Sequence, residues 1–376
     1  MFESLQQTPL LVFSNLLLIF ILYRYTRPAF VSGYLSSMRI KVTIAMCFVF
    51  CLFSFWGADW FGYLAYFKWA KNGSIEHVPM ETFYLWLIDE VCTNYLQFRV
   101  IVWGLALGLF VFTLKRLQLN LGVALFFFCS IYLITFSYAR ASLAMSLLFA
   151  GYSLLWEHNR KAFLKNRLIG LLLIGLSFFC HKSSALGIAA VVGAIIVKKW
   201  GRNGVILVLL AFPLLVFAMQ FFLQDMFGSI VSDEDSTFGQ YAQVGANYMD
   251  KKSGFSGIGT FIQKNILEQS PYYILALCCY KEIKSPSVEY GTPIKSMMVL
   301  LFVLVITALI FAFDLGVNTK TIFGRYLRYA QIPACIVLTY MYSNGIQPRL
   351  IRWAYTIGII GCFYSLIYTM YNVMVG

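Results

Sequence analysis

The chain has 376 residues, of which 60% are hydrophobic and 12% are charged, and its formal net charge is +13. A soluble domain usually carries about 25% charged residues, so this chain has too few polar side chains to cover a water-facing globule. Its apolar residues gather in runs of roughly 15–20, about the length that crosses a hydrocarbon core of about 30 Å. The composition excludes a secreted enzyme, a cytosolic globule and a disordered chain, and it predicts a polytopic membrane protein.

Twelve apolar runs follow one another along the chain and predict an all-α, polytopic transmembrane bundle, a single integral membrane domain over residues 1–376. The first run has no basic residue before it and has Arg24 and Arg27 after it, the opposite of a cleaved signal peptide. We therefore expect a retained span that enters from outside, with the N- and C-termini both outside. The runs centre near Leu18, Cys47, Leu105, Phe127, Leu147, Leu173, Val191, Leu210, Leu275, Leu304, Ile336 and Ile360.

The charges between the runs support this orientation. The loops predicted inside hold 18 of the 29 basic residues but only three of the 16 acidic ones. The inner side is then net +15 and the outer side net −2, as the positive-inside rule requires. Because the basic residues lie in short clusters between apolar runs, the net charge reports orientation, and we expect no nucleic-acid partner.

Two predicted outer segments, about 57–98 and about 224–264, are longer than turns. Long loops in compact proteins are usually functional or disordered. The inner loops are short and contain no GxxxxGK[ST] motif, which excludes ATP-driven transport by this chain alone. Most cysteines lie in apolar runs and no CxxC pair occurs, so we expect neither a metal site nor a cofactor.

Three outer clusters place polar groups directly beside apolar runs: Arg140, then His181 with Lys182, and then Arg325 with Arg328. Each cluster begins a helix predicted to run inward, so each lies at a helix N-terminus. A cation there is unfavourable because the N-terminal end of the helix dipole is positive, and a bound anion would compensate for it. Arg325 and Arg328 are three residues apart on one helix face, which suits a phosphate or diphosphate. Pairing with Asp or Glu, or contact with lipid phosphates, is the alternative for all three clusters.

Outer carboxylates supply candidate bases. Asp59 directly follows the second run, and Glu81 begins an aromatic segment that continues through Asp89 and Glu90, which we expect to form a helix on the outer surface. A carboxylate near a cationic cluster can neutralise an arginine or accept a proton from a substrate hydroxyl. His181 is a further candidate, either as a base or as a hydrogen-bonded orienting group. The sequence leaves these roles open.

At these residues the chain resembles the EpsG family, the Wzy-like polymerases of bacterial exopolysaccharide and O-antigen. The sequence departs from the family pattern at two places. Ala141 occupies a position where the family often has Gln, and the Glu81 segment lacks the Pro-Gly that commonly follows that Glu. The matching residues are Gly57, Asp59 and Tyr63 in a Gly-x-Asp-x-x-x-Tyr pattern, Arg140 and Ala144 at the start of a mid-chain helix, His181, Ser184, Ala185 and Leu186 in a His-x-Ser-Ala-Leu pattern offset by one serine, and Arg325 in an aromatic context.

The resemblance implies a GT-C-like membrane glycosyltransferase in the bacterial inner membrane. Such an enzyme takes a glycan from an undecaprenyl-diphosphate carrier at the periplasmic face and adds it to another carrier-linked repeat unit, without a metal. Membrane lipids, a chain-length regulator and a flippase are the other expected partners. The roles implied here are diphosphate binding by Arg140, Arg325, Arg328, Lys182 and Tyr63, a place near the reaction centre for His181, and base catalysis by Asp59 with Glu81 as its rival.

Two other functions compete with this interpretation. An O-antigen ligase would use the same donor with a different acceptor. A lipid-linked oligosaccharide flippase or transporter would carry charges facing a central cavity open to both sides. Few ionisable residues occur in the inner halves of the predicted spans, so the sequence favours chemistry at the outer face.

Overall fold

The structure is a computed structural model, and it describes residues 9–54, 59–73, 80–136, 139–156, 163–181, 183–230, 269–284, 292–312 and 326–375. Within these ranges all regular structure is helical and no strand occurs, which confirms the predicted all-α class. The elements are α1 (Pro9–Ser32), α2 (Ser37–Phe53), α3 (Asp59–Lys71), α4 (Thr82–Trp86), the π-helical η3 (Leu87–Val91), α5 (Tyr95–Arg116), α6 (Leu121–Phe127), the π-helical η4 (Phe128–Tyr132), α7 (Leu133–Phe136), α8 (Ala139–Leu155), α9 (Phe163–Cys180), α10 (Ser184–Ile230), α13 (Ser270–Lys284), α14 (Thr292–Ala312), α16 (Gln331–Ser343) and α17 (Pro348–Val375).

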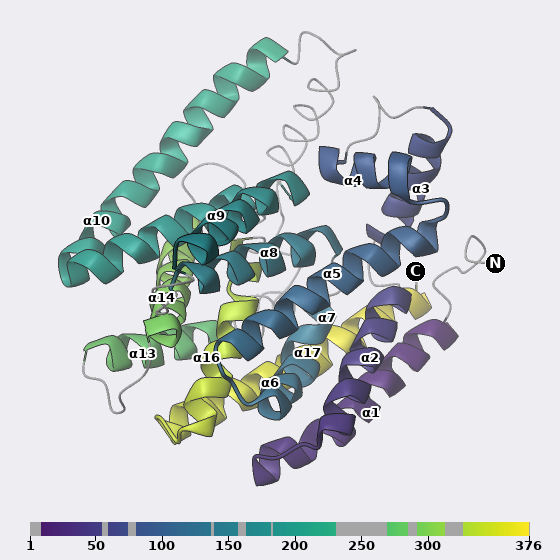
Figure 1. The fold of residues 1–376 in the computed structure, drawn as a ribbon, viewed down its shortest axis with the longest axis horizontal. Helices are drawn as coiled ribbons and strands as arrows, with labels where there is room; N and C mark the ends of the chain where they lie inside the picture. The colour runs from purple at the N-terminus through teal and green to yellow at the C-terminus, as the bar shows by residue number, and fades with distance from the viewer. Residues whose placement is uncertain are drawn as a thin grey trace.

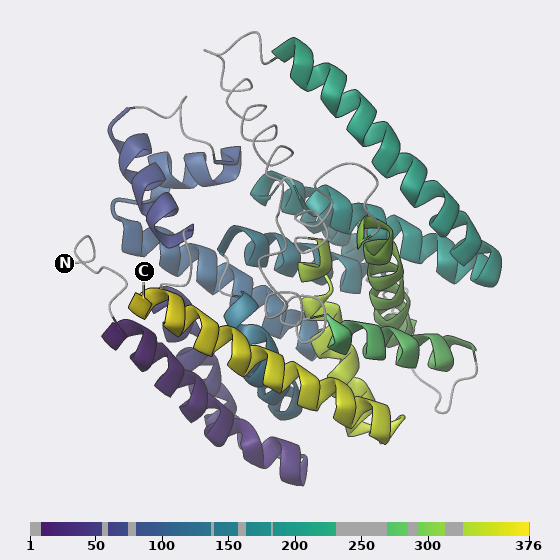
Figure 2. The same ribbon diagram turned by 180° about the vertical axis from the view of Figure 1, so that it is seen from behind.

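All twelve predicted run centres lie in these helices. The runs near Val191 and Leu210 share α10, and Gly201 breaks that helix between them with a φ of +54° and a ψ of −126°. Figures 1 and 2 show the two arms of α10 meeting at a sharp bend. The positive φ explains why a glycine occupies this bend, since other residues rarely adopt it.

Two of the described helices are long and apolar enough to cross a membrane, namely Tyr95–Arg116 and the part of α10 from Ser184 to Phe212. Three shorter apolar helices cover Leu121–Phe136, Arg140–Leu155 and Pro293–Leu309. Helix α9 also presents exposed leucines, including Leu164 at 69% and Leu172 at 62% exposure. An apolar surface of this kind fits contact with hydrocarbon. These features support a membrane protein, while the twelve-span count and the GT-C-like architecture stay predictions.

Described residues at the helix ends beside the predicted inner basic clusters contact one another at one end of the bundle. The start of α1, the end of α17, and α3 with α4 lie at the opposite end (Figures 1 and 2). We call these the basic end and the site end, and which side of a membrane each faces stays a prediction. The contacts at the basic end are Asn120 Nδ2 to the Gly33 carbonyl at 2.7 Å, Arg116 Nε to the Ser153 carbonyl at 3.4 Å, Lys198 Nζ to Ser296 Oγ at 2.8 Å, Gln347 Nε2 to Glu282 Oε1 at 3.0 Å, and the Tyr342 hydroxyl to the Phe30 carbonyl at 2.7 Å.

A buried arginine fixes the site end of α2. Arg99 of α5 is 4% exposed, and its guanidinium donates to the carbonyls of Cys51 and Leu52 in the last turn of α2. A cation at a helix C-terminus satisfies free carbonyls and complements the dipole. Helices α2 and α5 are therefore joined just before the segment that contains α3 and α4.

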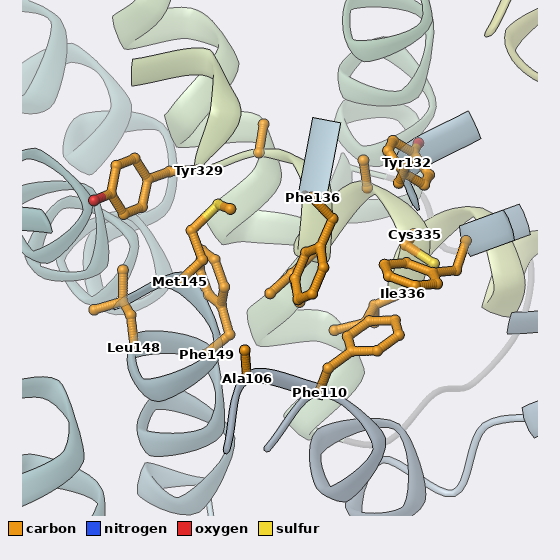
Figure 3. Close-up of a cluster of buried hydrophobic side chains, with 14 of the residues drawn as sticks. Ala106, Phe110, Tyr132, Phe136, Met145, Leu148, Phe149, Tyr329, Cys335 and Ile336 are labelled. Atoms are coloured by element: carbon orange, nitrogen blue, oxygen red, sulfur yellow. The ribbon is translucent and has the colours of Figure 1, made fainter. Parts of the chain in front are cut away.

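One cluster of the buried core lies between α5, α8 and α16, together with η4 and α7 (Figure 3). Aromatic rings fill it. Phe110 of α5 lies 4.5 Å from Phe128 of η4 between ring centroids, and Phe128 lies 5.1 Å from Phe136 of α7. This dense packing gives α8 a fixed position, and the first turn of α8 carries Arg140 to the site end.

Candidate functional site

The site is built around the carboxylate of Glu81. Glu81 holds the N-cap position of α4, yet its side chain makes no capping hydrogen bond to that helix. Instead Oε2 accepts from Arg140 Nη1 at 2.9 Å, and Oε1 lies 2.9 Å from His181 Nδ1. These partners are 59 and 100 residues away in the chain. A residue in a local helix-capping position therefore serves a contact between three distant segments.

Arg140 is fixed from several sides at the start of α8. Its Nε donates to the Tyr63 hydroxyl at 2.7 Å, and its guanidinium carbon lies 4.8 Å from the Tyr63 ring centroid. The Tyr84 hydroxyl of α4 donates to the Arg140 backbone carbonyl at 3.4 Å. The guanidinium is thus held by a hydrogen bond and a cation–π contact from α3 and by an ion pair with Glu81.

The three central side chains differ in exposure. The Glu81 side chain is only 9% exposed, whereas those of Arg140 and His181 are 22% and 24% exposed. The carboxylate therefore lies beneath two groups that keep an edge toward the surroundings.

The electrostatics of the site keep Glu81 ionised. Burial by itself would raise the pKa of the carboxyl, but the hydrogen bond with His181 and the positive charge of Arg140 outweigh it and lower the pKa below its ordinary value. An ionised carboxylate only accepts hydrogen bonds, so His181 must donate through Nδ1–H. In the neutral imidazole this leaves the basic lone pair on Nε2.

A pair of hydroxyls joins the turn that carries Arg328 to this site. The Ser183 and Tyr329 hydroxyls lie 3.0 Å apart. Tyr329 closes the turn that carries Arg328, which is partly exposed, and Ser183 belongs to the turn that follows His181. The turn that carries Arg328 is therefore in direct contact with the turn that follows His181.

The structure brings together Tyr63, Glu81, Arg140 and His181, four of the eight residues predicted for the site, and it places Arg328 in the adjoining turn. For Arg140, the alternative of pairing with an acid is what the structure shows. A diphosphate role for Arg140, Arg328 and Tyr63 stays a prediction.

The other predicted positions are less fully described. Asp59 is the first residue of α3, one helical turn before Tyr63, and its side chain lies outside the described part of the structure. Lys182 and Arg325 also lie outside the described residues. Of the two long outer segments, 57–98 contains α3, α4 and η3, and the expected surface helix after Glu81 corresponds to α4 and η3. Most of 224–264 is not described, since α10 ends at Ile230.

Sequence reasoning did not single out Tyr84, Ser183 or Tyr329. The chain contains 24 tyrosines, so an aromatic residue beside an arginine is a weak signal here. The one available signal for Tyr329 was its place directly after Arg328. Among the described residues, no group of three or more His, Cys, Asp or Glu side chains could hold a metal ion.

Comparison with protein families gives a match over most of the chain. The model of the EpsG family matches residues 10–375, which is nearly the whole chain. No curated protein matches, and no solved structure matches.

Proposed function

The chain belongs to the EpsG family, and from this we propose that it is a membrane glycosyltransferase that polymerises lipid-linked polysaccharide repeat units. The family is associated with polysaccharide polymerase-like function. The proposed donor is a glycan on undecaprenyl diphosphate, used at the periplasmic face of the inner membrane. The observation that carries the proposal is the Glu81 carboxylate held between Arg140 and His181 at the site end.

The Glu81–His181 pair supports base catalysis at the acceptor. In the proposed step the acceptor hydroxyl oxygen bonds to the anomeric carbon of the donor sugar while its proton passes to His181 Nε2. Glu81 fixes the ring orientation through Nδ1 and stabilises the imidazolium that forms. We therefore assign the proton transfer to His181 in preference to Asp59, and we assign Glu81 the orienting role.

The leaving group determines what the cations do. The bond between the anomeric carbon and the diphosphate oxygen breaks, and its electron pair leaves as negative charge on the lipid diphosphate. Fixed cationic donors stabilise such charge, and one donor is typically worth roughly 2.7–4 kcal/mol. Arg140 already pairs with Glu81, so in this proposal Arg325, Arg328 and Lys182 carry most of the diphosphate binding. Arg140 holds the Glu81 carboxylate, and the exposed edge of its guanidinium faces the diphosphate in this proposal.

Reconstitution of the purified protein tests the proposal. With an undecaprenyl-diphosphate-linked repeat unit and no added nucleotide or metal, we expect longer glycans and released undecaprenyl diphosphate. His181→Ala should lower the rate by at least about hundredfold, the usual contribution of a positioned base. His158→Ala, on a connection predicted inside, is the matched control and should keep the rate.

A deletion strain distinguishes the competing functions. Single repeats attached at the cell surface indicate a lost polymerase, whereas the absence of attached glycan indicates a ligase or a flippase and contradicts the proposal. Full activity in both Arg140→Ala and Arg325→Ala would separately contradict the cationic site.

A further inference from the structure

Two turns that are far apart in the chain meet through one pair of hydroxyls. Ser183 lies in the turn between α9 and α10, two residues after His181, and Tyr329 ends the turn that carries Arg328. The two hydroxyl oxygens are 3.0 Å apart although 146 residues separate them. This hydrogen bond, which we call the hydroxyl joint, links the proposed base to a turn with a candidate phosphate-binding arginine.

The ring of Tyr329 is buried in a closely fitting apolar site. The residue is 1% exposed, and Figure 3 shows its hydroxyl directed away from the apolar cluster. A Cβ at Gly187 of α10 would lie 2.6 Å from Leu148 Cδ2 and 2.9 Å from Tyr329 Cδ1. A glycine at 187 therefore lets the Tyr329 ring lie against the first turn of α10, directly after Ser183.

The same turn has a second anchor that points elsewhere. The hydroxyl of Tyr326, which is fully buried, bonds Oγ1 of Thr307 in α14. The turn itself is closed by backbone hydrogen bonds from Tyr329 N to Tyr326 O at 3.0 Å and from Ala330 N to Leu327 O at 2.9 Å. Tyr326 thus attaches the turn to the bundle, while Tyr329 attaches it to the His181 turn.

We propose that Tyr329 is a positioning residue, which through Ser183 sets the placement of the Arg328 turn relative to the Glu81–His181 pair. The inference rests on the proposed function, because it assigns the two turns to the two ends of one reacting bond. The cation must meet the leaving diphosphate while the imidazole meets the acceptor hydroxyl. A misplacement of about 1 Å in such an arrangement can cost about hundredfold in rate.

The test compares two buried tyrosines of one turn. Tyr329→Phe keeps the buried ring but removes the hydroxyl that forms the hydroxyl joint. We expect the polymerisation rate to fall about tenfold. Tyr326→Phe is the matched control, and it should keep the rate within about twofold even if the protein becomes less stable. Ser183→Ala should lower the polymerisation rate as much as Tyr329→Phe does, whereas Ser183→Thr, which keeps a hydroxyl, should retain the wild-type rate. The double variant Ser183→Ala/Tyr329→Phe should lose no more rate than either single variant.

Hydrogen exchange gives a readout that does not depend on activity. The amides of Ser184 and Leu186 donate within the His181 turn, to His181 O at 2.8 Å and to Ser183 O at 3.1 Å. We expect both amides to exchange about tenfold faster in Tyr329→Phe and at the wild-type rate in Tyr326→Phe.

The outcomes separate the two hypotheses. If the wild-type protein does not polymerise glycans, the proposed function is contradicted. The hydrogen-exchange rates alone then test whether the hydroxyl joint positions the two turns. Wild-type exchange in Tyr329→Phe overturns the proposal. Equal losses of rate in Tyr329→Phe and Tyr326→Phe, after correction for the folded fraction, also overturn it, because they indicate only a structural role.

Discussion

Each end of the bundle contains a cation packed on an aromatic ring, and the two cations differ in the partners that hold them. At the basic end, Lys198 Nζ lies 3.2 Å from the Trp156 ring centroid and donates to the neutral Ser296 hydroxyl. At the site end, Arg140 lies over Tyr63 and donates to the ionised Glu81, which also binds His181. A neutral partner holds a cation in place, whereas a carboxylate shared with an imidazole connects it to a group that transfers protons.

The buried carboxylates of the two ends differ in the same way. Glu282 at the basic end is 1% exposed and accepts from the side-chain amide of Gln347. Glu81 is nearly as buried, but its partners Arg140 and His181 keep an exposed edge. Burial alone does not mark a functional acid. Glu81 is a candidate because its two described partners, an arginine and an imidazole, are each partly exposed.

The comparison predicts its largest effect for removal of one negative charge at each end. Glu81→Gln should lower the polymerisation rate by at least about hundredfold, because the neutral amide no longer stabilises the imidazolium of His181. Glu282→Gln makes the same change at the basic end and should alter stability while the rate stays within about twofold of wild type. The measurement is the initial rate of glycan extension per folded protein. Equal losses at the two ends would show that both carboxylates are structural.

An exchange of the two cation types should give a smaller contrast. Arg140→Lys keeps the charge, but one ammonium cannot reproduce the planar fork that binds Tyr63 and Glu81 together, so we expect about a tenfold loss of rate. Lys198→Arg is the reciprocal control at the basic end and should leave the rate unchanged, since a guanidinium also stacks on the indole of Trp156. Initial rates at saturating donor measure both effects. Wild-type activity in Arg140→Lys would mean that only the charge of Arg140 matters.

The helices were predictable because the signal for them is local. A run such as that near Leu304 is continuous in the sequence, and α14 covers it. The basic cluster around Lys198 and Arg202 separated two runs, and Gly201 breaks α10 at that point. A continuous apolar run and the charges that flank it extend over about one helix length, so these helices can be recognised from the sequence without knowledge of the fold.

The site was predictable in its residue types but not in its pairings. Arg140 and His181 stand out because charged or imidazole groups interrupt apolar sequence, yet both Asp59 and Glu81 could serve as their acid. Glu81 reaches them because α4 begins directly after it and because α8 and α9 bring residues 59 and 100 positions away to the same end. The Tyr329 ring likewise lies where a Cβ at Gly187 would collide with it, and it reaches Ser183 across 146 residues of sequence. Such pairings follow from tertiary packing, which one sequence does not reveal.

Acid pH provides the smallest test of the difference between the two ends. The pKa of Glu81 is lowered from its ordinary value of 4.5 in the folded protein, so the ionised carboxylate stabilises the fold at neutral pH. A group whose pKa is lowered on folding loses this contribution as the pH falls from its unfolded pKa through its folded pKa. We therefore expect the melting temperature of the wild-type protein in detergent to fall by a few degrees below about pH 4.5, measured against Glu81→Gln, which has no carboxylate to protonate at that position. Arg140→Lys keeps a cation beside Glu81 and should retain part of this pH dependence. The same pH dependence in the wild-type protein and in Glu81→Gln would show that ionisation of Glu81, between His181 and Arg140, contributes nothing to the stability of the site end.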